Sequence, residues 1–271
     1  AVEFLNIPYS ISQADEQELL SLDIYTFRDA EVLKPVVIYF HGGAWSIGDK
    51  SRKIEDKIRL FHGLGYVFVS ANYRLSPFPA KPGDPDRIKF PVHNRDVARA
   101  IRWVHDSIHK YGGDQEKIVL IGHSAGAHLV SLTGTNERFL KEAGMELSDI
   151  DGIISLDSAC YDVEEMVRGR FQRLYINAFG TDPGEMKEAS PLHHISDKKD
   201  HPPFFIVKRG SGDRQQKIEE FVNSLENNRV KVLELNADIY THSGVNNAIG
   251  DEKDNLITPA IIEFLNQCFD G

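Results

Sequence analysis

Short apolar runs alternate with amphipathic segments along this chain, and that alternation constrains the fold more than any other feature. The runs are four or five residues long, and several begin or end near glycine or proline, as strands do. They cover residues 22–26, 36–40, 66–70, 117–121, 152–156, 204–207 and 232–235. Because such apolar runs suit strands that are buried on both faces, they predict a mostly parallel sheet.

Helical patterns fall between these runs. The clearest spans residues 96–110, where apolar side chains from Val97 to Ile108 repeat at helical spacing and Gly112 follows as a C-terminal glycine would. Further helices are expected over residues 53–60, from residue 127, around 218–225 and over 261–269. Helices that alternate with strands predict an α/β fold with helices on both faces of the sheet.

A chain of 271 residues has the size of one large α/β domain, so we expect a single domain over residues 1–271. Residues 161–196 interrupt the regular pattern, because this stretch is long, charged and mixed and lies between two predicted core strands. We therefore expect it to be an insertion that shapes a pocket.

The composition argues against several kinds of partner. Lys and Arg total 31 against 41 Asp and Glu, and no basic tract stands out, so neither nucleic acid nor an anionic membrane surface is expected. The longest apolar runs, such as residues 36–40, are far shorter than the about 20 residues of a membrane span. We expect no segment of this chain to cross a membrane.

The two cysteines, Cys160 and Cys268, lie far apart in the sequence, and we expect free, buried thiols rather than a disulfide framework. The first residues do not show the basic segment and apolar stretch of a secretory leader. We therefore favour a cytoplasmic protein, with secretion as the alternative if a leader has been removed.

The segment Gly122-His123-Ser124-Ala125-Gly126 fits the pattern Gly-x-Ser-x-Gly. It follows the predicted strand 117–121 and precedes a helical pattern, which is the strand-turn-helix setting of a nucleophile elbow. Glycines two residues to either side of the serine allow the sharp turn, since side chains there would collide with the adjoining strand or helix. Ser124 is therefore the predicted nucleophile.

A second glycine motif, His41-Gly42-Gly43-Ala44-Trp45, follows the predicted strand 36–40. Acyl transfer needs hydrogen-bond donors for a developing oxyanion, and a loop in this position can supply them. We expect the backbone amides of Gly43, Ala44 and Ala125 to form an oxyanion hole. Gly42 is expected to let the chain turn, and both Gly42 and Trp45 are expected to lie against the substrate.

Three segments together resemble the hormone-sensitive-lipase-like esterases of the α/β-hydrolase fold: residues 41–45, Asn72-Tyr73-Arg74-Leu75 and residues 122–128. Within that group the pattern is most similar to small bacterial carboxylesterases and to feruloyl or acetyl-xylan esterases. The likeness covers most of residues 7–130 and weakens afterwards. The sequence departs from the common His-Gly-Gly-Gly form of this group, because Ala44 stands in place of the third glycine.

In this fold the order of the triad is serine, acid, histidine, so both partners of Ser124 should lie downstream of it. Asp213 is the expected acid, because it follows the predicted strand 204–207 through a loop rich in glycine. Asp157, at the end of an earlier strand, is the competing choice, and Asp238 is a weaker one.

His242 is the expected base, since it follows the predicted strand 232–235 and lies beyond Asp213. Residues 241–246 are similar to the histidine loop of the family. His193 and His194 also lie downstream of the serine, but they precede Asp213 and lack this strand-loop setting. We expect His128, one helical turn after the serine, to pack nearby rather than to react.

These residues predict a carboxylesterase, and the resemblance implies small-molecule esters with short acyl or small aryl groups. His242 would take the proton of Ser124 as the serine attacks the carbonyl carbon, Asp213 would orient the imidazolium, and water would then release the acyl group. This chemistry needs no cofactor. We expect no metal either, because the sequence has no ligand spacing such as His-Glu-x-x-His.

Two other functions fit the same residues. Residues 122–128 also resemble the arylformamidases of kynurenine metabolism, which share the fold and would use the same triad. The other is a protein that binds a ligand without catalysis, since receptors that have lost a triad residue occur on this fold. All three expected triad positions are filled here, which favours an enzyme.

Overall fold

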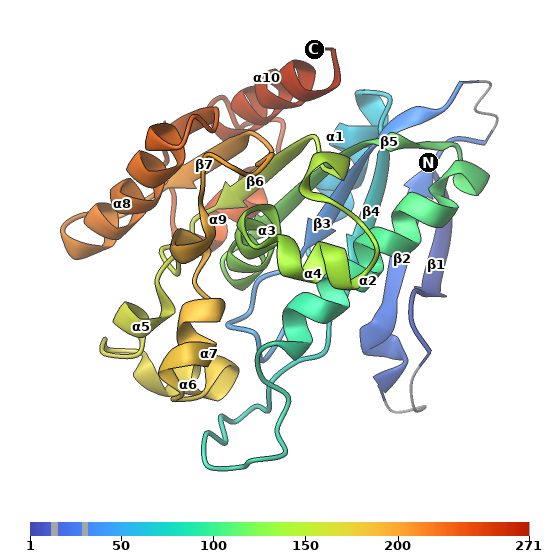
Figure 1. Ribbon diagram of the computed structural model, residues 1–271. Helices are drawn as coiled ribbons and strands as arrows, with labels where there is room; N and C mark the ends of the chain where they lie inside the picture. Colours follow the sequence, from blue (N-terminus) through green and yellow to red (C-terminus); the bar gives the residue numbers. More distant parts are fainter. Residues whose placement is uncertain (12–15, 29–31, 271) are drawn as a thin grey trace.

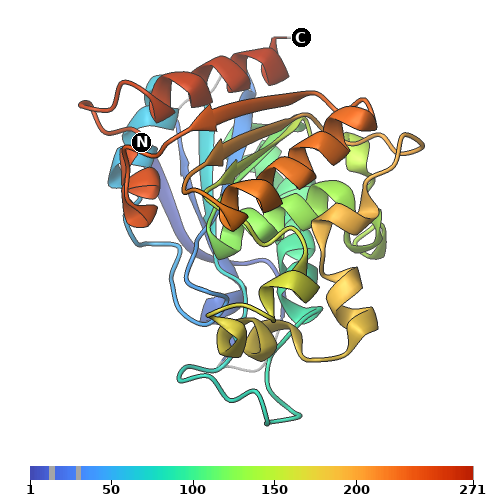
Figure 2. The ribbon, with the colours of Figure 1, turned by 90° about the vertical axis from the view of Figure 1, so that its left-hand side faces the viewer.

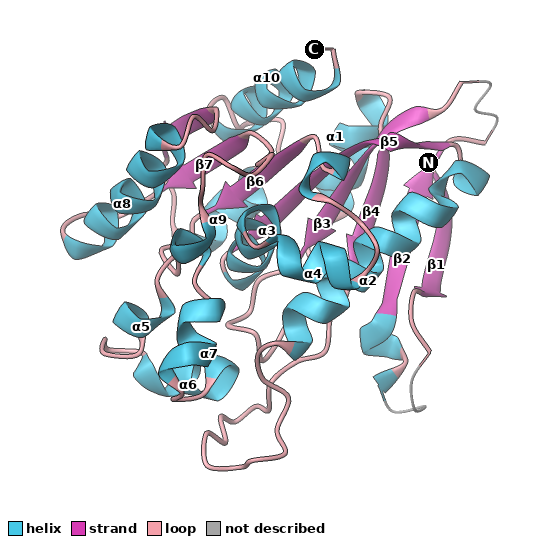
Figure 3. Cartoon of the chain, in the orientation of Figure 1, coloured by secondary structure: helices cyan, strands magenta, loops and turns pink. Residues whose placement is uncertain are grey.

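The computed structural model describes residues 1–11, 16–28 and 32–270, and within them one sheet of eight strands forms the centre of the protein (Figures 1 and 3). The strand order is β1-β2-β4-β3-β5-β6-β7-β8. The bounds are β1 Val2–Pro8, β2 Ser21–Thr26, β3 Lys34–Phe40, β4 Val67–Ala71, β5 Gly113–His123, β6 Gly152–Leu156, β7 Phe204–Lys208 and β8 Val232–Asn236. All neighbours from β4 to β8 pair in parallel, whereas β2 pairs antiparallel with both β1 and β4.

Both faces of the sheet are buried, because successive side chains of a strand point to opposite sides. In β3, Val36 and Ile38 pack into one apolar cluster, while Val37 and Tyr39 pack into the other. The first face is covered by α2 Val92–Ser107, α3 Ala125–Thr135, α4 Glu137–Glu142 and α8 Asp213–Asn227. The second face is covered by α1 Glu55–Gly63, α9 His242–Ala248 and α10 Ile257–Phe269, and Figure 2 shows α8 and α10 on opposite sides of the sheet.

The predicted strands and helices are confirmed, with ends that move by a few residues. The expected helix 96–110 begins earlier, at Val92, and its last turn is a 3-10 helix, Ile108–Tyr111. β1 is not among the predicted strands; it is an edge strand, and most of its residues are exposed.

Residues 161–196 form short helices between β6 and β7, which gather below the sheet in Figures 1 and 2. These are α5 Val163–Met166, α6 Gln172–Phe179, α7 Pro183–Glu188 and a 3-10 helix, Pro191–His194. Elsewhere in the described part of the chain, Glu18–Leu20 and Leu147–Asp149 also form 3-10 helices. Asn177 in α6 accepts a hydrogen bond from the amide of Lys81 at 2.9 Å and donates one to the carbonyl of Pro77 at 3.0 Å. The loop after β4 is therefore fastened to these helices. None of the helices in the described part of the chain has the length and apolarity needed to span a membrane.

Candidate active site

Ser124 lies in a sharp turn between β5 and α3, with φ 56° and ψ −115°. Both glycines of the motif are needed for this turn. A Cβ on Gly122 would lie 2.3 Å from the carbonyl carbon of Gly126, and a Cβ on Gly126 would lie 2.1 Å from the carbonyl oxygen of Phe40. The Ser124 amide donates to the carbonyl of Leu156 at 2.9 Å, which ties the turn to the end of β6.

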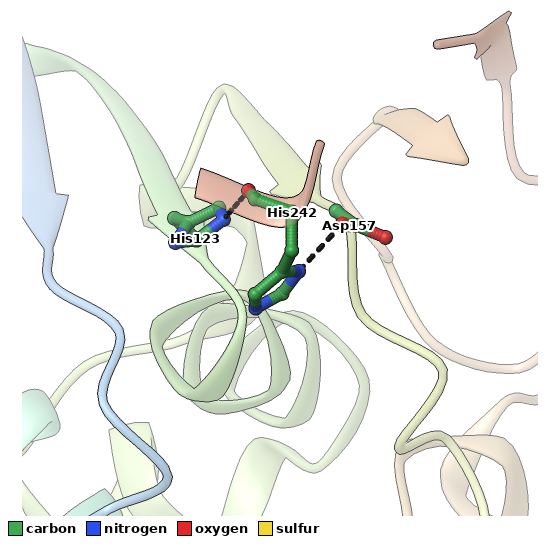
Figure 4. A group of neighbouring side chains, drawn as sticks. All are labelled: His123, Asp157 and His242. Atoms are coloured by element: carbon green, nitrogen blue, oxygen red, sulfur yellow. Dashed lines mark hydrogen bonds and ion pairs between the residues drawn. The ribbon is translucent and has the colours of Figure 1, made fainter. Parts of the chain in front are cut away.

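His242 and Asp157 complete a hydrogen-bonded line with the serine. The Nε2 atom of His242 lies 2.9 Å from Ser124 Oγ, and its Nδ1 atom lies 2.6 Å from Asp157 Oδ2. Figure 4 shows the second of these contacts, with the imidazole of His242 beside the carboxylate. His242 is the first residue of α9, and Asp157 directly follows β6 with its side chain fully buried. The structure thus brings together a hydroxyl, an imidazole and a carboxylate in the geometry of a serine hydrolase.

The structure corrects the expectation that Asp213 faces His242. Asp213 is exposed in the first turn of α8, and its side chain has no hydrogen bond or ion pair with any residue that the structure describes. The third choice, Asp238, is exposed and accepts hydrogen bonds from the Gly210 amide and the Asn236 side chain. β6 lies next to β5 in the sheet, one strand closer to Ser124 than β7. The carboxylate that contacts His242 is therefore the one that follows β6, Asp157.

Two arginines hold the carboxylate of Asp157, and no pattern in the sequence predicts them. The Nε atom of Arg209 lies 2.9 Å from Asp157 Oδ2, and Arg214 donates from Nη2 to Oδ1 and, at 3.1 Å, to the backbone carbonyl of Asp157. Burial alone would raise the pKa of Asp157, but the hydrogen bond from His242, the charge of Arg214 and the hydrogen bond from Arg209 lower it to about 2. The carboxylate is therefore ionised over the whole range in which such a protein is assayed.

His123, next to the serine, supports the loop that carries His242. Its Nε2 atom lies 2.8 Å from the His242 carbonyl oxygen, as Figure 4 shows, and the two rings lie 4.7 Å apart. Since a carbonyl can only accept, Nε2 of His123 carries a proton. Burial, followed by the neighbouring His242, lowers the pKa of His123 to about 4, so the ring is neutral near pH 7.

Ligand atoms of His123, Asp157 and His242 all lie within 4.8 Å of one another, as in a metal site. Their contacts fit hydrogen bonding better than ion binding. Nε2 of His123 has no free lone pair while it donates to a carbonyl, and the Asp157 carboxylate already faces His242, Arg209 and Arg214. The Asp157 carboxylate is thus shared by one imidazole and two guanidinium groups, while His123 is bonded to the loop that carries His242.

The glycine loop after β3 approaches the serine turn closely. A Cβ on Gly42 would lie 2.8 Å from the carbonyl oxygen of His123 and 3.1 Å from Ser124 Cβ. The backbone amides of Gly43, Ala44 and Ala125 have no hydrogen-bond acceptor among the described residues. Ala44 and Ala125 line the same cavity as Ser124, whereas Gly42 and Gly43 line a neighbouring one. Gly42 therefore does not line the cavity beside Ser124, and its lack of a side chain allows the close approach of this loop to the serine turn.

Residues 72–75, one of the three segments that carry the resemblance, hold this loop in place through hydrogen bonds. The Tyr73 hydroxyl donates to the carbonyl of His41 at 2.9 Å. The Asn72 side chain accepts from the Lys50 amide at 2.7 Å and donates to Asp49 at 2.9 Å. These contacts connect Asp49 and Lys50, which follow the glycine motif in the chain, to Asn72 directly after β4.

Backbone strain is concentrated at this site. Of the seven non-glycine residues with positive φ in the described chain, four belong to it: Ala44, Trp45, Ser124 and Asp157. Each left-handed residue costs about 1–3 kcal/mol, so surrounding contacts must maintain the conformation. Ala44 has φ 51°, a conformation that glycine adopts without strain, which is consistent with its replacing the third glycine of the common motif.

The cavity beside Ser124 has a volume of about 520 Å³, within the usual range for small-molecule sites. Its apolar wall includes Trp45 and three residues of the helical segment 161–196, namely Phe171, Leu174 and Tyr175. Trp45 is buried against His128 and Phe179, while Phe171 is more than half exposed at the protein surface. The segment that interrupts the sequence pattern thus supplies one side of this cavity.

Three other histidines downstream of Ser124, namely His128, His193 and His194, do not contact Ser124, His242 or Asp157 through hydrogen bonds. His128 is buried and donates from Nε2 to the carbonyl of Ala189 at 2.8 Å, as expected for a packing residue. His193 lies 3.4 Å from Asp162, and His194 contacts the carbonyl of Glu188 at 2.9 Å. The two cysteines are free, with Cys160 buried in the cavity wall and Cys268 half-buried.

The strand order, the serine turn after β5 and the histidine after β8 define an α/β-hydrolase fold. Residues 22–223 match the model of the BD-FAE family, and the chain belongs to that family. The predicted fold class and the resemblance to esterases of this fold are confirmed.

Known proteins similar to this chain agree with that assignment. Esterase LipQ of Mycobacterium tuberculosis is 34% identical over 64% of this chain and 41% of its own length. LipM of the same organism, described as a probable carboxylic ester hydrolase, is 32% identical over 69% of this chain and 43% of its own length. The chain therefore spans less than half of these two relatives.

Among solved structures, a truncated carbohydrate esterase from gut microbiota superposes with a TM-score of 0.80 at 18% identity, covering 100% of this chain and 97% of that one. Esterase B from Lactobacillus rhamnosis superposes with a TM-score of 0.75 at 18% identity, covering 98% of this chain and 84% of the other. At such identities these likenesses establish the fold alone.

Proposed function

We propose that this protein is a serine carboxylesterase that uses Ser124, His242 and Asp157. The observation that carries the proposal is the continuous line from the serine hydroxyl through His242 to a buried, ionised aspartate. The names of the relatives, which are esterases or carboxylic ester hydrolases, support the same activity.

In the proposed mechanism, His242 Nε2 accepts the proton of Ser124 as Oγ attacks the carbonyl carbon of the ester. Asp157 holds the Nδ1 proton of His242 and stabilises the imidazolium that forms. The unpaired amides of Ala44 and Ala125, with that of Gly43, are the proposed donors to the oxyanion. His242 then protonates the leaving alcohol. In the second half of the reaction, His242 takes a proton from water as the water attacks the acyl carbon, and returns it to Ser124 Oγ as the acid is released.

The substrate we propose is an ester with a short acyl or small aryl group. The cavity is of moderate size, and aromatic side chains of Trp45, Phe171 and Tyr175 form part of its wall. Aromatic rings pack well against other rings, so a small aryl group fits this wall. We further propose that residues 161–196 set this preference, because three of the lining residues belong to that segment.

A panel of 4-nitrophenyl esters tests both the activity and this preference. We expect kcat/KM to be highest from acetyl to about butyryl and to fall by about tenfold or more at dodecanoyl, because a long chain exceeds the cavity. Phenyl acetate and formanilide are measured beside them. Fastest hydrolysis of the long-chain esters would contradict the proposed pocket, and cleavage of formanilide without ester hydrolysis would favour an arylformamidase.

On the acid side of the pH profile, kcat/KM should depend on the protonation of a single group. Asp157, with a pKa of about 2, stays ionised above about pH 4, and His123, with a pKa of about 4, is already neutral above pH 5. The base must be unprotonated to accept a proton, so kcat/KM should rise with pH on the acid side of the profile, and neither Asp157 nor His123 should contribute to that rise above pH 5.

The profile is measured with a neutral ester, so that kcat/KM reports the free enzyme. Below the midpoint of this rise, a plot of log kcat/KM against pH is expected to have a slope of one. A rate that stays flat down to pH 4 would mean that no histidine acts as base, and a slope of two would mean that a second group titrates with it.

A further inference from the structure

Two cationic side chains line the cavity beside Ser124. Arg209 directly follows β7, Arg214 lies in the first turn of α8, and both contribute to the cavity wall. Their side chains are 26% and 32% exposed, respectively, so neither is fully withdrawn into the protein. We refer to Arg209 and Arg214 as the arginine pair.

Holding Asp157 uses only part of each guanidinium group. Arg209 contacts the carboxylate through Nε, and Arg214 through Nη2, while the Nε atom of Arg214 donates to the carbonyl of Arg209 at 2.9 Å. Both Nη atoms of Arg209 and the Nη1 atom of Arg214 have no acceptor among the residues that the structure describes. Donors with fixed geometry therefore remain free on side chains that line the cavity.

The cavity wall also carries an excess of positive charge. The arginine pair contributes two positive charges against the single negative charge of Asp157, and no other Asp, Glu, Lys or Arg of the described chain lines the cavity. The whole chain has a net charge of −10, so this excess is opposite in sign to that of the protein. One arginine would balance the buried carboxylate, which leaves the second without a structural requirement for its charge.

We propose that the arginine pair recognises a carboxylate on the substrate, so that the preferred substrates are anionic esters. This inference rests on the proposed esterase function and specifies its substrate class. A carboxylate can accept charge-assisted hydrogen bonds from the free Nη atoms while the ester carbonyl lies at Ser124. The pair also attracts anions into a site on an otherwise acidic protein.

Matched ester pairs test this proposal. For a carboxylate on the alcohol side, 4-acetoxybenzoate is compared with its neutral methyl ester; for the acyl side, monophenyl glutarate is compared with phenyl pentanoate. In the unmodified protein we expect kcat/KM for the anionic member of at least one pair to exceed that of the neutral member by about tenfold or more. Added salt should lower the rate of the anionic ester and not that of the neutral one.

Arg209→Gln and Arg214→Gln should each lower this anionic-to-neutral ratio by about tenfold or more. Because both residues position Asp157, both esters are expected to slow, and the ratio rather than the rate is the readout. Arg209→Lys should retain part of the ratio, since it keeps the charge. Arg168→Gln is the matched control, because Arg168 is an exposed arginine that pairs with Glu164 and does not line the cavity.

Calorimetric binding of 4-acetoxybenzoate and of monophenyl glutarate to Ser124→Ala, with and without Arg214→Gln, gives a second measurement that does not depend on turnover. We expect the arginine substitution to weaken binding of the preferred anion by about tenfold or more. Ratios near one in both ester pairs, with neutral esters still hydrolysed, would overturn the anion proposal alone. Hydrolysis of neither member of any pair would overturn the proposed esterase function.

Discussion

Replacing Ser124 with alanine is expected to lower kcat for a neutral ester by about 10⁴- to 10⁶-fold, the range seen when the nucleophile of a serine hydrolase is removed. The hydroxyl is the group that forms the acyl-enzyme, and no other hydroxyl in the described chain lies in line with His242. The substitution removes one oxygen atom from the serine side chain, so the melting temperature should change by only a few degrees.

Steady-state kinetics and labelling by a fluorophosphonate probe measure this effect together. Ser158→Ala is the matched control, because Ser158 lines the same cavity but its hydroxyl accepts from the Cys160 amide instead of facing His242. We expect the control to keep its labelling and to lose less than about tenfold in kcat. Wild-type activity in purified Ser124→Ala protein would refute the mechanism, and absence of labelling in the unmodified protein would favour a protein that only binds its ligand.

Asp157→Asn is expected to lower kcat by about 10⁴-fold, whereas Asp213→Asn should change it by less than about twofold. An amide beside Nδ1 of His242 favours the wrong tautomer of the imidazole and cannot stabilise the imidazolium. Among the described residues, the Asp213 side chain has no hydrogen bond or ion pair through which its loss could reach the histidine. The contrast between the two variants therefore tests the assignment of the acid directly.

Folding must be checked for Asp157→Asn, because Arg209 and Arg214 both face this carboxylate. Circular dichroism and thermal unfolding show whether the variant retains its structure. Labelling by the fluorophosphonate probe, compared between the Asp157 and Asp213 variants at equal folded concentration, then separates slow chemistry from lost protein. If Asp213→Asn abolishes activity and Asp157→Asn does not, the acid follows β7 after all.

Most of the fold could be predicted because its strands are buried on both faces. A parallel strand covered by helices needs apolar side chains at nearly every position, and that need is visible in runs such as residues 36–40 and 204–207. The edge strand β1 lacks this need and was not predicted, since its side chains are mostly exposed. The helical segment 161–196 was predicted only as an irregular stretch, because its helices are short and pack around a cavity rather than on the sheet.

The sequence by itself determined the position of the serine and the histidine. The serine turn needs its two glycines within five residues, and the histidine follows the last strand, so both signals are local in the chain.

Only the tertiary structure decided which carboxylate faces His242. Asp157 and Asp213 both follow a strand and both lie between the serine and the histidine, so chain order cannot separate them. The choice depends on the order of strands in the sheet, which places the end of β6 between those of β5 and β7. It also depends on Arg209 and Arg214, whose charges lie next to Asp157 although more than 50 residues separate them in the chain. Contacts between residues so distant in sequence form only when the sheet assembles, and for that reason no local pattern records them.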